Sequence, residues 1–251
     1  MRPSQAMNLR LMAALLSESR AIFEFNAFFS TRLLMRAFPK GDGHPVLFLP
    51  GFMASDFSTG PMRRLFKDLG YVTSGWELGR NVVVNEEREA EMQALLRAYS
   101  DSHGRKVSIV GWSLGGVFAR EIAKAHPECV RQVISLGSPI SGHAVSEPVD
   151  GAFMAVNGTP NAEERKRRRT LGEAPPVPTT SIYSKTDSIV AWRRSVQKQQ
   201  ETQTENIEVP ASHLGLGVNP LVMYAIADRL AQPEGDWKPF DKSGAARIFF
   251  K

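Results

Sequence analysis

The stretch VSIVGWSLGGVFAR, Val107 to Arg120, changes character half-way along its length. Its first half is an apolar run typical of a buried strand, and from Gly115 the pattern is that of the first turn of a buried helix. Between them Ser113 has a glycine two residues away on either side, which fits the pattern G-x-S-x-G. In that pattern the serine occupies a sharp strand-to-helix turn with no room for flanking side chains. We therefore expect the Ser113 hydroxyl at the carboxyl end of a strand, where open α/β sheets bind ligands.

Strand-like and helix-like segments alternate on both sides of this stretch. This alternation predicts βαβ units, and therefore an α/β fold with a mostly parallel sheet and helices on both faces. The expected strands are 46–50, 71–76, 106–110, 130–136, 180–183 and 206–209, and the expected helices begin at Ser58 or Thr59 and cover 85–100, 115–125 and 220–230.

Composition sets the outer limits on function. The chain has 251 residues, 42% hydrophobic and 23% charged, which suits one domain with one large core. Cys129 is the single cysteine, so no disulfide forms within the chain and a cytoplasmic location is the default. The run 165–169 accounts for all of the formal charge of +5, so the rest of the chain is not a basic surface for nucleic acid. No apolar stretch reaches the roughly 18 residues that span a membrane.

We expect residues 1–40 to form an N-terminal helical segment that precedes the α/β domain at 41–251. Residues 7–38 are rich in Leu and Phe and predict one or two amphipathic helices. We expect these helices to pack on the body of the protein, with a membrane-surface or dimer contact as the alternative. The apolar run LMAALL is too short for a secretory signal.

The interval 138–178 interrupts the alternation. It is rich in proline, contains the basic run 165–169 and shows no clear core element. Loops this long inside a compact domain are usually lids or unstructured segments. We expect a lid or small cap over Ser113, with apolar residues 153–156 beside the basic run. Such a lid suits peripheral contact with an anionic, lipid-like surface, and a solvated helix face without a partner is the alternative.

A serine hydroxyl needs a base, and the chain offers five histidines. His213 follows the last expected strand, in VPASHLGLG, at the same edge of the sheet as Ser113. His143, inside the interval 138–178, is the reserve. The remaining histidines are expected at the opposite edge of the sheet or at the far end of the helix that Ser113 opens: His44, His103 and His126.

The base in turn needs an orienting carboxylate. Asp187 follows an expected strand in YSKTDSIVAW, again at the carboxyl edge, and is also placed to cap the short turn near Val190. Two other aspartates are the alternatives: Asp150 lies in the interval 138–178, and Asp236 comes after the last expected helix. Attack by a serine on a carbonyl group produces an oxyanion, which backbone N–H groups can bind. The stretch PGFM after the first strand offers the N–H of Phe52, which would bind the oxyanion together with the N–H of Leu114.

Over residues 45–230 the chain resembles esterases and lipases of the α/β-hydrolase fold, through LPGF, GWSLGG, GSP and the loops of Asp187 and His213 in that order. The resemblance implies a Ser113–His213–Asp187 triad that hydrolyses carboxylic esters with fairly apolar acyl groups through an acyl-enzyme, with no metal or organic cofactor. Pro50-Gly51 stands where many lipases have His-Gly. A thioesterase or acyltransferase with the same triad is the alternative, and a catalytically inactive binding scaffold is a third. The oligomeric state and the natural substrate do not follow from the sequence.

Overall fold

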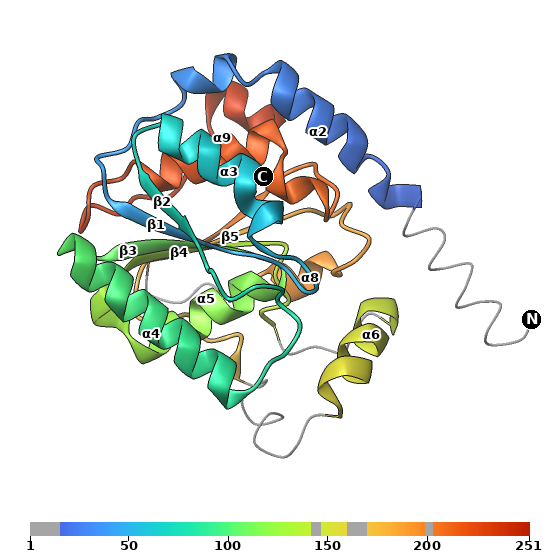
Figure 1. Cartoon of the computed structure of the whole chain (residues 1–251). Helices are drawn as coiled ribbons and strands as arrows, with labels where there is room; N and C mark the ends of the chain where they lie inside the picture. Colours follow the sequence, from blue (N-terminus) through green and yellow to red (C-terminus); the bar gives the residue numbers. More distant parts are fainter. Residues whose placement is uncertain (1–15, 142–146, 160–169, 199–202) are drawn as a thin grey trace, which may run out of the picture.

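A computed structural model describes residues 16–141, 147–159, 170–198 and 203–251, and its centre is a six-stranded sheet of order β2-β1-β3-β4-β5-β6 (Figure 1). Every neighbouring pair of strands is parallel, which confirms the predicted fold class. The strands are β1 Pro45–Leu49, β2 Val72–Gly75, β3 Val107–Trp112, β4 Val130–Leu136, β5 Thr179–Tyr183 and β6 Thr204–Glu208.

Helices cover both faces of this sheet, as predicted (Figure 1). One face carries α4 (Glu86–His103) and α5 (Leu114–Ala125), and the other carries α2 (Ala21–Ser30), α3 (Asp56–Asp68) and α9 (Pro220–Leu230). The other helices of the described residues are α6 Glu147–Asn157, α8 Trp192–Ser195 and the 3₁₀ turns η1 Leu34–Ala37, η2 Pro127–Cys129, η3 Gly215–Gly217 and η4 Gly244–Ile248.

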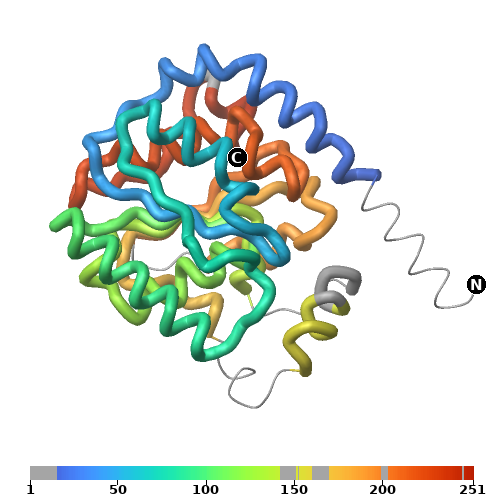
Figure 2. Tube along the Cα trace, viewed as in Figure 1, coloured from blue at the N-terminus to red at the C-terminus, as the bar shows by residue number. Residues whose placement is uncertain are grey.

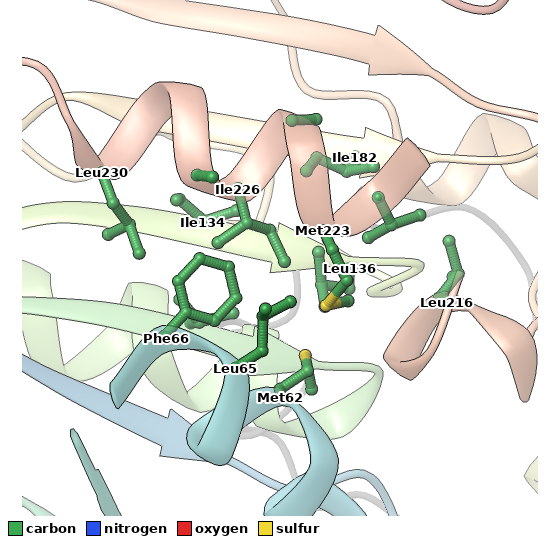
Figure 3. Close-up of a cluster of buried hydrophobic side chains, with 14 of the residues drawn as sticks. Met62, Leu65, Phe66, Ile134, Leu136, Ile182, Leu216, Met223, Ile226 and Leu230 are labelled. Atoms are coloured by element: carbon green, nitrogen blue, oxygen red, sulfur yellow. The ribbon is translucent and has the colours of Figure 1, made fainter. Parts of the chain in front are cut away.

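The central strands are buried on both of their faces, and in β1 this burial appears in the sequence as the apolar run PVLFL. All residues of β1 and β4 are buried, as parallel sheets require when helices cover both sides. On one face, side chains of α3 and α9 lie together with those of β4 and β5 in one apolar cluster, which Figure 3 shows. Burial of each large apolar side chain there contributes roughly 1.5–3 kcal/mol. The labelled side chains are Met62, Leu65, Phe66, Ile134, Leu136, Ile182, Leu216, Met223, Ile226 and Leu230.

The start of α3 differs from the prediction. The helix begins at Asp56, ahead of the expected cap at Ser58 or Thr59, and Pro61 lies inside it. Ser58 Oγ donates to Ser55 O at 2.8 Å, and Thr59 Oγ1 donates to Asp56 O at 3.2 Å. Both hydroxyls therefore bond back to the preceding turn, which satisfies them inside the helix instead of at its cap.

The interval 138–178, where a lid or small cap is expected, contains the helix α6. The prolines of this interval do not prevent the helix, since Pro148 lies in its first turn, where the missing N–H costs little. The basic run 165–169 and His143 lie outside the described residues, and the lid expected here stays a prediction.

The N-terminal segment packs on the face that carries α3 and α9. Phe28 of α2 and Met35 of η1 are each 1% exposed and belong to the same apolar cluster as the α3 and α9 side chains. Residues 7–15 of the expected amphipathic region lie outside the described part. None of the helices within the described residues is long and apolar enough to cross a lipid bilayer.

At the amino edge of the sheet, His44 is fully buried between two partners. Its Nδ1 lies 2.5 Å from Asp42 Oδ1, and its Nε2 lies 2.9 Å from Ser108 Oγ. Burial lowers the pKa of His44 from 6.5 to about 4, although the hydrogen bond with Asp42 acts in the opposite direction. The ring is therefore neutral in the folded protein at pH 7.

This buried ring predicts an acid-sensitive step in stability. The folded-state pKa lies below the unfolded value, so the unfolded chain takes up the proton first as the pH falls from 6.5 towards about 4. Over that window, His44 should lower the free energy of unfolding by up to about 3 kcal/mol. Denaturant titrations at several pH values should give a shallower pH slope for His44→Gln than for the parent. Equal slopes would contradict the assignment.

Candidate active site

The candidate nucleophile Ser113 stands in a strained turn between β3 and α5. Its backbone has φ 54° and ψ −120°, a conformation that costs a non-glycine residue on the order of 1–3 kcal/mol. Ser113 N donates to Leu136 O at 2.8 Å, so the end of β4 holds the turn. A Cβ on Gly111 would overlap the backbone of Gly115, and a Cβ on Gly115 would overlap that of Leu49. Space therefore requires both glycines of the pattern.

Two backbone N–H groups beside Ser113 are available to an anion. Within the described part of the chain, no hydrogen bond to a protein acceptor is found for Leu114 N or Phe52 N. Leu114 opens α5, where the helix dipole favours negative charge. A Cβ added to Gly51 would lie 3.3 Å from Ser113 Cβ, so the Phe52 loop runs directly against the serine.

The candidate base and acid form a buried pair. His213 Nδ1 lies 2.7 Å from Asp187 Oδ2, and the two side chains are only 5% and 1% exposed. Asp187 Oδ1 accepts from Ile189 N at 2.9 Å and from Val190 N at 2.7 Å. The two carboxylate oxygens thus have different roles: Oδ1 caps the turn after β5, and Oδ2 orients the imidazole ring. With Nδ1 on Asp187, Nε2 is the ring nitrogen left for proton transfer.

Neighbouring strand ends hold this pair beside the serine turn. Trp112 Nε1 donates to His213 O at 3.2 Å, which ties the His213 loop to the residue before Ser113. A Cβ on Gly137, at the end of β4, would lie 3.0 Å from Asp187 Oδ2 and 3.2 Å from His213 Nδ1. The structure therefore brings Ser113, Asp187 and His213 to one edge of the sheet. Ser113 Oγ makes no hydrogen bond within the described residues, and catalytic hydrogen bonds often tighten only when substrate is bound.

A second hydrogen-bonded series of serine, histidine and aspartate lies elsewhere in the protein, where no substrate can reach it. Ser108, His44 and Asp42 are hydrogen-bonded in the same order, but Ser108 lies within β3 and both Ser108 and His44 are fully buried at the amino edge. That serine cannot meet a substrate, so the arrangement is structural.

The other candidates lie elsewhere. Asp236 is exposed and forms an ion pair with Lys238 at 3.2 Å. His126 bonds to Glu128 and Gln93, and Asp150 lies in the first half of α6. Among the described residues, no three or more His, Cys, Asp and Glu side chains are grouped so that they could hold a metal ion.

Asn81 holds the loop that carries Phe52, a role that the sequence pattern does not predict. Asn81 Nδ2 donates to Pro50 O at 2.8 Å, Met53 N donates to Asn81 O at 2.7 Å, and Asn81 N donates to Ala54 O at 2.8 Å. These bonds fix the loop on both sides of Phe52, including Met53 with its φ of 60°. No local pattern marks this asparagine, because its partners lie about thirty residues earlier in the chain.

The helix α6 touches the same loop. The ring of Phe153 lies 5.5 Å from the ring of Phe52, centroid to centroid. Asn157 Oδ1 accepts from Val84 N at 2.8 Å, and its Nδ2 donates to Val82 O at 3.0 Å. The helix is thus anchored beside the candidate oxyanion loop, apart from the helices that cover the sheet (Figure 1).

The arrangement of strands, helices and serine turn is that of the α/β-hydrolase fold, and the chain has this fold. It is similar to lipase B of Aspergillus fumigatus, with a TM-score of 0.62 and 18% identity over 80% of this chain and 56% of that one. A lipase of Bacillus licheniformis gives a TM-score of 0.57 at 16% identity, over 77% and 94%. A thioesterase domain from the curacin biosynthetic pathway gives a TM-score of 0.51 at 14% identity, over 78% of this chain and 93% of that one. The sequence matches no family model and no curated protein.

Proposed function

We propose that this protein is a serine hydrolase that cleaves carboxylic esters through a covalent acyl-enzyme. The observation that carries the proposal is the buried 2.7 Å pair of His213 and Asp187 at the edge of the sheet where Ser113 occupies its strained turn. A serine beside a base that a carboxylate orients is the arrangement needed to activate a hydroxyl.

In the proposed reaction, Ser113, His213 and Asp187 act first in acylation and again in deacylation. His213 Nε2 takes the proton of Ser113 as Oγ attacks the ester carbonyl, and the N–H groups of Phe52 and Leu114 bind the developing oxyanion. The imidazolium, stabilised by Asp187, then gives its proton to the leaving alcohol. Water attacks the acyl-serine with His213 as base, which releases the carboxylic acid and restores Ser113.

The loop beside the nucleophile supports an apolar acyl group. Phe52 and Phe153 form an aromatic contact there, and Met53 is 54% exposed on the same loop. A panel of p-nitrophenyl esters with increasing acyl length tests this: turnover should be present and should improve as the chain lengthens from acetyl. An absence of turnover across the panel would contradict the ester-hydrolase proposal.

Thioester hydrolysis or acyl transfer is the second candidate, because the same triad performs both. Its support is the likeness to a thioesterase domain. Acyl-CoA and the p-nitrophenyl ester of the same acyl group separate the candidates by their relative kcat/KM. Transfer to an added alcohol, measured as new ester, identifies an acyltransferase.

Peripheral membrane contact is a further part of the proposal, and the N-terminal segment supports it. Apolar side chains there are strongly exposed, while the exposed charged residues between 16 and 40 are all cationic. Apolar side chains among cations suit the interface of an anionic bilayer. The apolar residues are Leu16, Ile22, Phe23, Phe25, Phe29, Leu33 and Leu34, and the cations are Arg20, Arg36 and Lys40.

The double variant Phe23→Ser with Leu34→Ser should bind anionic vesicles at least about tenfold more weakly, since each such side chain contributes roughly 1.5–3 kcal/mol when fully buried. Sedimentation with vesicles measures the binding. Val72→Ser removes an exposed apolar side chain from the edge strand β2 and should bind like the parent. Hydrolysis of a small soluble ester should be unchanged in both. Equal sedimentation of the double variant and the parent would contradict the membrane proposal.

A further inference from the structure

Glu18, from the N-terminal segment, reaches the loops of both the candidate acid and the candidate base. Its Oε1 accepts from His213 N at 3.1 Å, and its Oε2 accepts from Leu214 N at 2.8 Å. Oε1 also accepts from Ser188 Oγ at 2.6 Å and from Ser188 N at 3.2 Å. One carboxylate thus joins the backbone of His213 to the residue that follows Asp187.

Glu24, on α2, holds the same histidine loop from the other side. It accepts hydrogen bonds from Ser212 N at 3.1 Å and from the Ser212 hydroxyl, and Asn219 Nδ2 donates to it at 2.8 Å. A Cβ on Gly215 would overlap the Glu24 carboxylate, so this glycine leaves the space that Glu24 occupies. In Figure 2, α2 runs beside this late segment of the chain, although nearly two hundred residues separate them.

The Glu18 carboxylate is buried, so its hydrogen bonds are needed to stabilise its charge. Glu18 is 2% exposed, and a buried carboxylate is costly unless donors surround it. Burial raises its pKa, but the hydrogen bonds from Leu214, Ser188 and His213 prevail and hold the pKa below 4.5. Glu18 is therefore charged at neutral pH and accepts from every one of these donors. The loop Ser212–Leu214 has its successive N–H groups bound to Glu24, Glu18 and Glu18 again.

We propose that Glu18 and Glu24 are positioning residues of the active site, which fix the backbone of the His213 loop so that the imidazole meets Ser113. The inference rests on the proposed function, because it concerns the same triad. It makes the N-terminal segment a component of the catalytic centre. A loop held at three successive N–H groups cannot slide along the sheet edge, and misplacement by about 1 Å can cost a hundredfold in rate.

The first test replaces each carboxylate by its isosteric amide. Glu18→Gln turns one oxygen into an NH₂ group that faces an N–H donor, and Glu24→Gln does the same to one oxygen of Glu24. Each should lower kcat for a p-nitrophenyl ester by about tenfold to a hundredfold, with KM within about twofold. Glu205→Gln is the matched control, since Glu205 is also buried and pairs with Arg229 at 2.7 Å, away from the His213 loop. It should lower the melting temperature and leave kcat unchanged.

Gly215→Ala tests the contact from the opposite side. The added methyl group would displace the Glu24 carboxylate, so kcat should fall as it does for Glu24→Gln. This variant and Glu24→Gln carry the test if Glu18→Gln does not fold. If all of the folded variants lose melting temperature but keep the kcat of the parent, the carboxylates only attach the segment to the body, and the proposal is overturned.

Hydrogen exchange keeps this inference separate from the proposed function. Peptides covering 211–216 should exchange faster in Glu18→Gln and Glu24→Gln than in the parent, and should be unchanged in Glu205→Gln. This readout needs no substrate. If the parent cleaves no ester but the variants show this exchange pattern, the proposed chemistry is refuted, while the positioning of the His213 loop by Glu18 and Glu24 is supported. Unchanged exchange in both amide variants would overturn the proposal that Glu18 and Glu24 fix the His213 loop.

Discussion

Replacement of Ser113 by alanine is expected to lower kcat for ester hydrolysis by about 10⁴–10⁶-fold, the loss found when the nucleophile of a serine hydrolase is removed. The fold should tolerate the change, because Ser113 Oγ makes no hydrogen bond within the described residues and alanine keeps the Cβ that the turn accommodates. The melting temperature should therefore stay within a few degrees of the parent value, as thermal unfolding can show.

Ser108→Ala is the matched control for this variant. It removes a serine from the same strand and from a hydrogen-bonded chain of the same residue types, Ser108, His44 and Asp42. We expect a lower melting temperature and an unchanged kcat, because Ser108 is buried at the amino edge. Activity that survives Ser113→Ala but not Ser108→Ala would contradict the assignment of the nucleophile.

Replacement of Asp187 by asparagine should lower kcat by about 10⁴-fold. An amide that accepts from Ile189 N and Val190 N through its oxygen must present NH₂ to His213 Nδ1, which stabilises the wrong tautomer of the ring. Steady-state kinetics of the purified variant measure the loss.

Asp236→Asn and Asp150→Asn are the controls for Asp187. Asp236 is exposed and paired with Lys238, and Asp150 lies in α6. Both variants should retain the activity of the parent within about twofold. A larger loss from Asp150→Asn than from Asp187→Asn would move the acid into the 138–178 interval.

The central fold could be predicted because its signals are local. The strand β1 is buried on both faces and is a continuous apolar run in the sequence. The glycines around Ser113 indicate a turn in which backbone segments lie in contact. Ser113, Asp187 and His213 each follow a predicted strand, so their presence at one edge follows from parallel connections.

The residues that hold the site could not be predicted, because they act over long separations in sequence. Glu18 and Asn81 look like ordinary polar residues until the fold brings them to the His213 loop and to the Phe52 loop. The helix α6 has no clear sequence signal for a different reason: the interval 138–178 is rich in proline, and Pro148 itself lies in the first turn of the helix.

Labelling with a fluorophosphonate tests the central claim most directly, because this reagent phosphonylates a serine hydroxyl only where a base activates it. Peptide mass mapping of the labelled protein should find the adduct on Ser113 alone, with no adduct on Ser113→Ala and much slower labelling of Asp187→Asn. An unlabelled parent protein, or an adduct on another serine such as Ser188 or Ser212, would contradict the account.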